Sequence, residues 1–296
     1  IEPAIESFQK AIEINPKCAE AYFYIGMLLK EKGEPKAAIE HYQTVIEIDP
    51  NSAAAYNNMA VVLRDIGNPD SAINNLKQAL IFDPNCAETY NNMGNSFSDK
   101  GNHEAAIENY QQAIKINPDH ADAFANLGFS QRDSGDLNAA IKSYEKAIDL
   151  KPNYIVSHFN MGMALRDLGN QDGAIESYKR AIHIDPNCAE AYNNIGNIYK
   201  DAGNLDSATE NYQTAIKLDP VLFSAHNNLG ISLERQGKTD AAVESFKQAI
   251  KLEPENASVR HILAALTGQQ TASAPNDFVE GLFDSYAVRF DQSLVE

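Results

Sequence analysis

The chain has 296 residues, of which 44% are hydrophobic, and its formal net charge is -17 at pH 7. This composition is typical of a soluble folded protein, and so acidic a chain is a poor partner for nucleic acid or an anionic membrane, because both attract clustered Lys and Arg. No apolar run approaches the ~18 residues of a membrane-spanning helix and no signal peptide is recognisable, so we expect a cytoplasmic protein. The opening IEPAIESFQK, without an initiator Met, indicates a fragment of a longer protein.

Proline recurs every 34 residues along most of the chain, and glycine keeps the same period. The prolines in this register are Pro16, Pro50, Pro84, Pro118, Pro152, Pro186, Pro220 and Pro254. A fixed period of this length is typical of a solenoid, in which one supersecondary unit stacks on copies of itself. In chain order, the register predicts the second helix of a truncated repeat over residues 1–16, seven full repeats over 19–256, and a final first helix or cap over 257–270.

Each repeat is predicted to hold two helices. In residues 189–222 the first helix runs over about 189–202, where Gly203 supplies a left-handed C-cap. The second begins near Asp206 and ends before Pro220, because the residue that precedes proline avoids helical angles. Small and apolar residues recur on one face of each helix. They are Tyr192, Ile195, Gly196 and Tyr199 in the first helix, and Ala208, Tyr212 and Ala215 in the second.

The three cysteines, Cys18, Cys86 and Cys188, obey the same period. They lie at least two repeats apart, which is too far for a disulfide bond. We therefore expect reduced thiols, as in cytosolic proteins.

The repeat resembles the tetratricopeptide repeat (TPR), a 34-residue unit with an aromatic residue at positions 4 and 24, Gly at 8, Ala at 20 and 27, and Pro at 32. In the third full repeat these positions are Tyr90, Tyr110, Gly94, Ala106, Ala113 and Pro118. The resemblance covers residues 1 to about 266. It implies an all-α, right-handed superhelical solenoid of helix-turn-helix units, with the first helices along a concave face where the family's ligands bind. The departures are His158 and His226 at position 4, Ala60 at position 8 and Leu76 at position 24.

Asparagine recurs at two adjacent positions of the first helix, although it is a poor helix former. It stands at position 6 in Asn58, Asn92, Asn126, Asn160, Asn194 and Asn228, and at position 5 in Asn57, Asn91, Asn193 and Asn227. Each costs up to ~0.7 kcal/mol relative to alanine, so we expect a compensating role. An amide offers donors and an acceptor that match a peptide backbone, and one amide per repeat is spaced to contact an extended chain about every third residue. The pattern predicts a peptide-binding groove.

A structural role for these amides is the alternative, in which they bond to one another between repeats or keep a wide groove hydrated. The position-6 ladder is similar to that of the O-linked N-acetylglucosamine transferases, which implies a backbone clamp at the six matching residues. Position 9 adds Asn95 and Asn197 to the predicted peptide-binding set. A TPR subfamily that binds chaperone C-termini also has Asn at position 9, together with Lys at position 5. No lysine stands at position 5 in this chain, so we do not expect that type of binding site.

A stripe of charge follows positions 12 and 13, which are basic and acidic in most repeats, as in Arg64–Asp65 and Arg132–Asp133. Because adjacent residues on a helix do not face each other, we expect these charges to pair between neighbouring repeats. Contact with an acidic ligand is the alternative.

The period stops near residue 270. Residues 271–277, TASAPND, are predicted to form a linker, and residues 278–296 an amphipathic helix rich in Phe and Leu. This helix could cap the last repeat, dock on the solenoid or a neighbouring molecule, or begin a truncated downstream domain. The last interpretation rests on HILAALTG (261–268) and FVEGLFDSYAVRFDQSLV. These stretches resemble the junction of bacterial proteins in which TPRs precede an S-adenosylmethionine-dependent methyltransferase domain.

The chain lacks recognisable catalytic motifs. It contains no Gly-rich phosphate loop, Cys-x-x-Cys or His-Glu-x-x-His, so we expect no catalytic residue, metal or cofactor. The sequence predicts a non-catalytic interaction module for a protein or extended peptide, which recruits substrates within a larger bacterial protein. The alternatives are the N-terminal part of a methyltransferase, less favoured a glycosyltransferase, or a free-standing scaffold that assembles several proteins.

Overall fold

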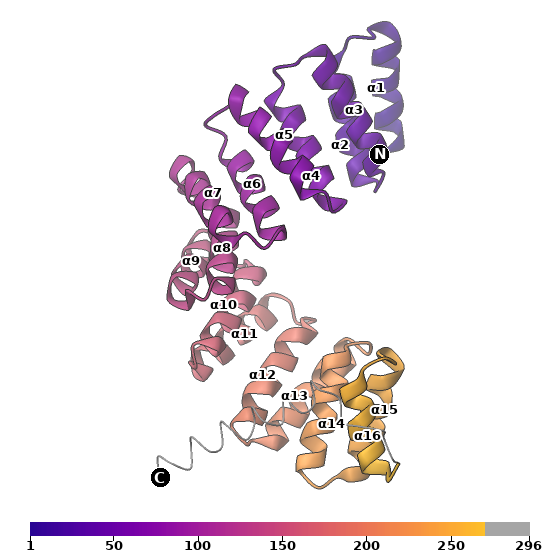
Figure 1. Cartoon of the computed structure of the whole chain (residues 1–296), viewed down its shortest axis with the longest axis vertical. Helices are drawn as coiled ribbons and strands as arrows, with labels where there is room; N and C mark the ends of the chain where they lie inside the picture. The colour runs from indigo at the N-terminus through magenta and orange to yellow at the C-terminus, as the bar shows by residue number, and fades with distance from the viewer. Residues whose placement is uncertain (270–296) are drawn as a thin grey trace. The chain divides into compact units, whose positions relative to one another are not determined.

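The computed structural model describes residues 1–269, in which 16 α-helices follow one another without a strand (Figure 1). The all-α architecture is therefore as predicted. The chain divides into two compact units, Ile1–Leu168 and Gly169–Glu296. The predicted linker over 271–277 and the predicted helix over 278–296 lie outside the described residues. No helix within residues 1–269 is long and apolar enough to cross a membrane.

Even-numbered helices are the first helices of repeats, called helices A here, and odd-numbered helices are the second, called helices B. The first unit contains α1 (Glu2–Ile14), α2 (Ala19–Glu31), α3 (Pro35–Ile48), α4 (Ala53–Asp65), α5 (Pro69–Phe82), α6 (Ala87–Asp99), α7 (His103–Ile116), α8 (Ala121–Asp133), α9 (Leu137–Leu150) and α10 (Ile155–Asp167). The described part of the second unit contains α11 (Gln171–Ile184), α12 (Ala189–Asp201), α13 (Leu205–Leu218), α14 (Phe223–Arg235), α15 (Thr239–Leu252) and α16 (Ala257–Thr267).

The turn between helices A and B is built from a glycine followed by a capping residue. Gly101 has φ +72°, in the left-handed region where a side chain is strained. The next residue, Asn102, caps α7: its Oδ1 accepts a hydrogen bond from the backbone N–H of Ala105 at 3.1 Å. Such a cap satisfies one of the unpaired N–H groups at a helix start. The same cap is made by Asn68, Asp136, Asn170 and Asn204.

The two helices of a repeat meet where position 8 of helix A faces position 24 of helix B. A Cβ on Gly94 would lie 2.5 Å from ring carbon Cε1 of Tyr110, so glycine is required for the ring to fit. The corresponding pairs Gly26–Tyr42, Gly128–Tyr144, Gly196–Tyr212 and Gly230–Phe246 show the same close approach. Large rings thus lie fully buried beneath helices A, and the backbones approach closely.

The two histidines at position 4 bond to the loop that precedes their helix. His158 Nε2 lies 2.9 Å from the carbonyl oxygen of Pro152, and His226 Nε2 lies 3.1 Å from that of Pro220. Because a carbonyl can only accept, each Nε2 carries the proton.

Candidate functional site

The predicted amides form cross-repeat hydrogen bonds, which we call rungs. In the first unit, Asn92 Nδ2 donates to Asn57 Oδ1 and Asn126 Nδ2 donates to Asn91 Oδ1, both at 3.1 Å. In the second unit, Asn228 Nδ2 donates to Asn193 Oδ1 at the same distance. In every rung, position 6 of one repeat donates to position 5 of the repeat before it.

A rung forms only where the preceding repeat supplies an asparagine at position 5. Asn58 follows a repeat with Phe23 at that position, and it donates instead to the carbonyl of Ala54 at 2.9 Å. Asn160 follows Ala125, and its amide has no hydrogen-bond partner within residues 1–269; the same holds for Asn194 and Asn227 in the second unit. The residue at position 5 therefore decides which position-6 amides form a rung.

Two of the three position-5 asparagines that accept a rung are buried. Asn91 and Asn193 are 5% and 6% exposed, and Asn92 is 7% exposed. The other asparagines at these two positions are partly buried: Asn57, Asn58, Asn126, Asn160, Asn194, Asn227 and Asn228. A rung uses one of the donor's two amide hydrogens, which leaves its second N–H and its Oδ1 for other partners.

The asparagines at position 9 bond to core tyrosines. The hydroxyl of Tyr110 donates to Asn95 Oδ1 and that of Tyr212 donates to Asn197 Oδ1, both at 2.8 Å. This bond was missed from the sequence, although position 9 is asparagine only in repeats with tyrosine at position 24. Where position 9 is Met27, the buried hydroxyl of Tyr42 lacks a hydrogen-bond partner in the described chain, and Tyr144 opposite Phe129 is in the same situation.

Burial in these hairpins raises the pKa of the tyrosine hydroxyls. It raises the pKa of Tyr42 to about 12. For Tyr110 the pKa is raised first by burial and further by the negative charge of Asp99, while Arg64 opposes the rise. Both charged groups are therefore close enough to Tyr110 to affect its hydroxyl.

Four basic residues of the charge stripe pair within their own repeat, so the predicted pairing between repeats is not the main pattern. Arg132 and Arg166 each lie 2.8 Å from the aspartate that follows them, and Lys200 lies 3.5 Å from Asp201. The Cβ atoms of adjacent helical residues point in different directions. A long basic side chain nevertheless bends back far enough to reach the carboxylate of the next residue. A cross-repeat pair of the predicted kind joins Arg64 Nε and Asp99 Oδ2 at 3.6 Å.

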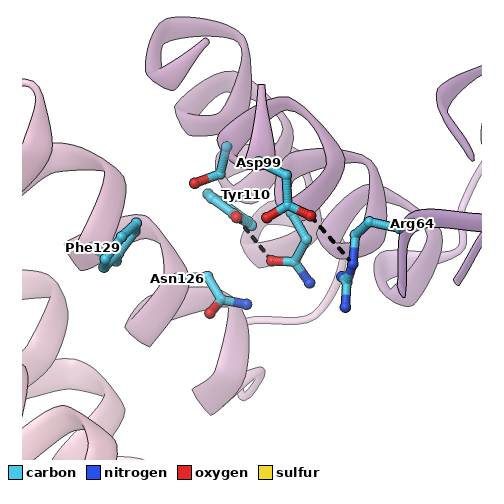
Figure 2. A pocket seen from close by; sticks show the side chains of 7 residues that line it. Arg64, Asp99, Tyr110, Asn126 and Phe129 are labelled. Atoms are coloured by element: carbon cyan, nitrogen blue, oxygen red, sulfur yellow. Dashed lines mark hydrogen bonds and ion pairs between the residues drawn. The ribbon is translucent and has the colours of Figure 1, made fainter. Parts of the chain in front are cut away.

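A polar pocket of about 300 Å³ lies in the first unit between α4, α6, α7 and α8. Figure 2 shows Asp99 and Arg64 joined by their ion pair, with Tyr110 beside them and with Asn126 and Phe129 on the adjacent helix. The lining residues are Arg64, Asn95, Ser98, Asp99, Tyr110, Asn126 and Phe129. Two of the predicted peptide-binding asparagines thus lie in one pocket. Residues 1–269 contain no cluster of three or more His, Cys, Asp or Glu that could hold a metal ion.

Comparison with protein families identifies the repeat. The family described as TPR repeat matches residues 26–67, 94–132, 130–165, 162–203 and 196–237, which is more than half of the chain. The chain belongs to the tetratricopeptide-repeat family. Further matches described as tetratricopeptide repeat cover residues 7–40, 53–86 and 223–256. TPRs are protein-interaction modules, which gives this member its general role.

Solved structures of other TPR proteins share the fold. MamA is 32% identical, with 56% of this chain and 97% of that chain covered, at a TM-score of 0.50. YrrB, described as a TPR protein with an unusual peptide-binding site, is 26% identical, with 62% and 95% covered, at a TM-score of 0.52. The Cut9–Hcn1 hetero-tetramer of the APC/C, at 16% identity, covers 88% of this chain and 51% of that chain at a TM-score of 0.66, which shows the fold alone. A comparison with curated proteins found no match.

Proposed function

We propose that this TPR array is a non-catalytic module that binds an extended polypeptide segment along its helices A. The contacts come from the amides at position 6: Asn58, Asn92, Asn126, Asn160, Asn194 and Asn228. The likeness to YrrB supports a peptide ligand, because that protein is described as having a peptide-binding site. The absence of recognisable catalytic motifs in the sequence fits a binding role for this chain.

The main support for the proposal is that a rung orients an asparagine amide and leaves part of its hydrogen-bonding capacity free. In the Asn126–Asn91 rung, one N–H is bound, while the second N–H and Oδ1 of Asn126 have no partner in the described part of the chain. An amide that is held in place loses less side-chain entropy when a ligand arrives. Packed helices lie ~8–10 Å apart, so successive amides match about every third residue of an extended chain, which advances ~3.3 Å per residue.

The remaining asparagines of the predicted set have supporting roles in this proposal. Asn57, Asn91 and Asn193 position the amides that donate to them. Asn227 stands before a repeat with Ile262 at position 6, so it makes no rung and contacts the ligand itself. Asn95 and Asn197 each hold a core tyrosine with Oδ1 and retain their N–H groups for the ligand.

The test replaces three ladder residues together, in the variant Asn126→Ala, Asn160→Ala and Asn194→Ala. The probes are fluorescein-labelled peptides selected on the wild-type array from a random 16-residue display library. Each net hydrogen bond contributes about 0.5–1.5 kcal/mol, so the Kd measured by fluorescence anisotropy should rise at least about tenfold. Circular dichroism should show that the variant keeps its helices.

A matched control is provided by three asparagines on helices B, in the variant Asn75→Ala, Asn109→Ala and Asn211→Ala. Each of these donates to a carbonyl of its own helix, at 2.9, 2.8 and 2.8 Å respectively. This variant should bind the peptides with the wild-type Kd. Equal Kd values for the ladder variant and the wild type would reject the clamp, and a selection that enriches no peptide would reject the binding function itself.

A second candidate function is substrate recruitment within a bacterial, cytoplasmic S-adenosylmethionine-dependent methyltransferase. It is favoured by one observation, the resemblance of residues 261–296 to the junction of TPR–methyltransferase fusions. The competing interpretations are that residues 278–296 dock on the array, and that the chain is a scaffold for several proteins. Reading the source gene beyond the codon for Glu296 tests it: an open frame that encodes a strand and a glycine-rich loop supports the fusion, and a stop codon rejects it.

A further inference from the structure

The pairing of charges along positions 12 and 13 is interrupted in one repeat. In the repeats on either side, Arg64 is followed by Asp65 and Arg132 by Asp133, so each pair is neutral. In the third repeat, position 12 is Ser98, and the basic residue that follows Asp99, Lys100, pairs with Asp70 instead. The other six repeats each balance one basic against one acidic residue at these positions. Within the described chain, no cation of its own repeat therefore pairs with Asp99.

Asp99 is only partly neutralised by the neighbouring repeat. Its Oδ2 lies 3.6 Å from Nε of Arg64, while Nη2 of the same guanidinium lies 3.2 Å from Asp65 Oδ1. Within residues 1–269, Arg64 is the one cation at ion-pair distance from Asp99. One positive charge thus serves two carboxylates, and the Asp99 side chain remains 54% exposed.

The rest of the pocket suits the stem and head of a long basic side chain. Phe129 is 38% exposed and offers apolar surface, while Arg132, which lies 5.5 Å from its ring centroid, is neutralised by Asp133. Asn126 presents its free Oδ1 as an acceptor for N–H donors. Lys and Arg pack methylene groups against apolar surface while their charged ends stay at polar groups.

We propose that this pocket is a subsite that takes one basic side chain, Lys or Arg, of the bound segment. The proposal rests on the proposed peptide binding and adds its specificity. The charged end of the ligand side chain pairs with Asp99 and donates to Asn126 Oδ1, and its stem lies on Phe129. A ligand carboxylate is disfavoured, because Arg64 is already engaged by two aspartates. The net charge of -17 favours basic segments at longer range.

The experiment uses the same selected 16-residue peptides. In each peptide every Lys and Arg is replaced in turn by Gln and by norleucine, and Kd is measured by anisotropy at 50 mM NaCl. We expect one position at which replacement raises Kd about fivefold on the wild-type array, the upper range for an exposed ion pair. On the Asp99→Asn array the same replacement should change Kd less than twofold.

Two further variants distinguish this pocket from a general effect of negative charge. Ser98→Arg supplies the cation that neighbouring repeats have at position 12, so it should fold normally and abolish the preference as Asp99→Asn does. Asp201→Asn removes a carboxylate that is paired with Lys200 in the second unit, and it should leave the preference intact.

The outcomes separate the two proposals. If peptides bind but Gln and norleucine replacements act equally on the wild-type and Asp99→Asn arrays, the subsite is wrong and peptide binding stands. Selected peptides without Lys or Arg would likewise overturn the subsite and leave peptide binding in place. If no peptide is enriched, the binding function fails and the subsite fails with it.

Discussion

At the scale of single residues, the side chains at positions 8 and 24 must be matched in size, because they pack against each other. Glycine stands opposite a ring in five described hairpins, because a Cβ would lie 2.5–2.9 Å from a ring carbon. In the second repeat the ring is replaced by Leu76 and the glycine by Ala60, and both are fully buried. The sequence presents these as two separate departures from the TPR pattern. The structure shows that the two departures compensate each other. Leu76 is smaller than a tyrosine ring, and the methyl group of Ala60 fills the space that it leaves.

The Ala60–Leu76 pair can be tested by exchange. Leu76→Tyr alone should place a ring against the Ala60 methyl and destabilise the array by about 1–3 kcal/mol, the usual cost of overpacking. Ala60→Gly together with Leu76→Tyr recreates the pair found in other repeats, so most of the loss should be recovered. Urea unfolding followed by circular dichroism measures both. Additive effects of the two substitutions would show that the positions are not coupled.

At the scale of helices, boundaries were predictable and polar partners were not. Glycine, a capping residue and proline mark the ends of each helix in the sequence, and α12 (Ala189–Asp201) ends one residue before the predicted end. An asparagine amide, by contrast, bonds equally well to a ligand or to a neighbour, so the register between repeats was needed to find the rung from Asn126 to Asn91. The Arg132–Asp133 pair likewise depends on side-chain bending that a helical pattern omits.

The cap of α7 gives a prediction for one element. Asn102→Ala removes the acceptor for the backbone N–H of Ala105, and loss of an N-cap costs about 0.5–2 kcal/mol. Asn102→Asp should be nearly neutral, since aspartate caps as well as asparagine and fills the equivalent place at Asp136. Urea midpoints for the two variants measure the difference. A loss as large for Asp as for Ala would show that the amide acts through another contact.

At the scale of the whole molecule, the stability of a repeat array is approximately the sum of its repeats and their interfaces. Each of the two compact units has a core that includes tyrosines at position 24. Tyr42 and Tyr144 belong to the first, and Tyr212 to the second; all three are fully buried. Burial raises the pKa of each hydroxyl. Ionisation of buried tyrosine hydroxyls should therefore lower the stability of both units at alkaline pH.

We expect the array to unfold in alkali between about pH 10 and pH 12. An unfolded tyrosine ionises near pKa ~10, whereas burial raises the pKa of Tyr42 to about 12. The folded chain therefore holds more protons in this interval, and stability falls as pH rises. Below pH 10 the contribution is fully present. A difference of two units corresponds to about 3 kcal/mol for one tyrosine, which is a large part of a typical net stability of ~5–15 kcal/mol.

Titration of helicity and of tyrosinate together decides whether the buried hydroxyls cause this unfolding. Absorbance at 295 nm reports ionisation, and circular dichroism at 222 nm reports helix; the buried tyrosines should ionise only as helix is lost. Tyr42→Phe removes one ionisable group whose hydroxyl has no partner within residues 1–269, so its alkaline midpoint should move to higher pH while its urea midpoint at pH 7 stays level or rises. Complete tyrosine ionisation near pH 10 with helicity intact would refute burial as the cause, because hydroxyls that titrate normally contribute no pH-dependent stability.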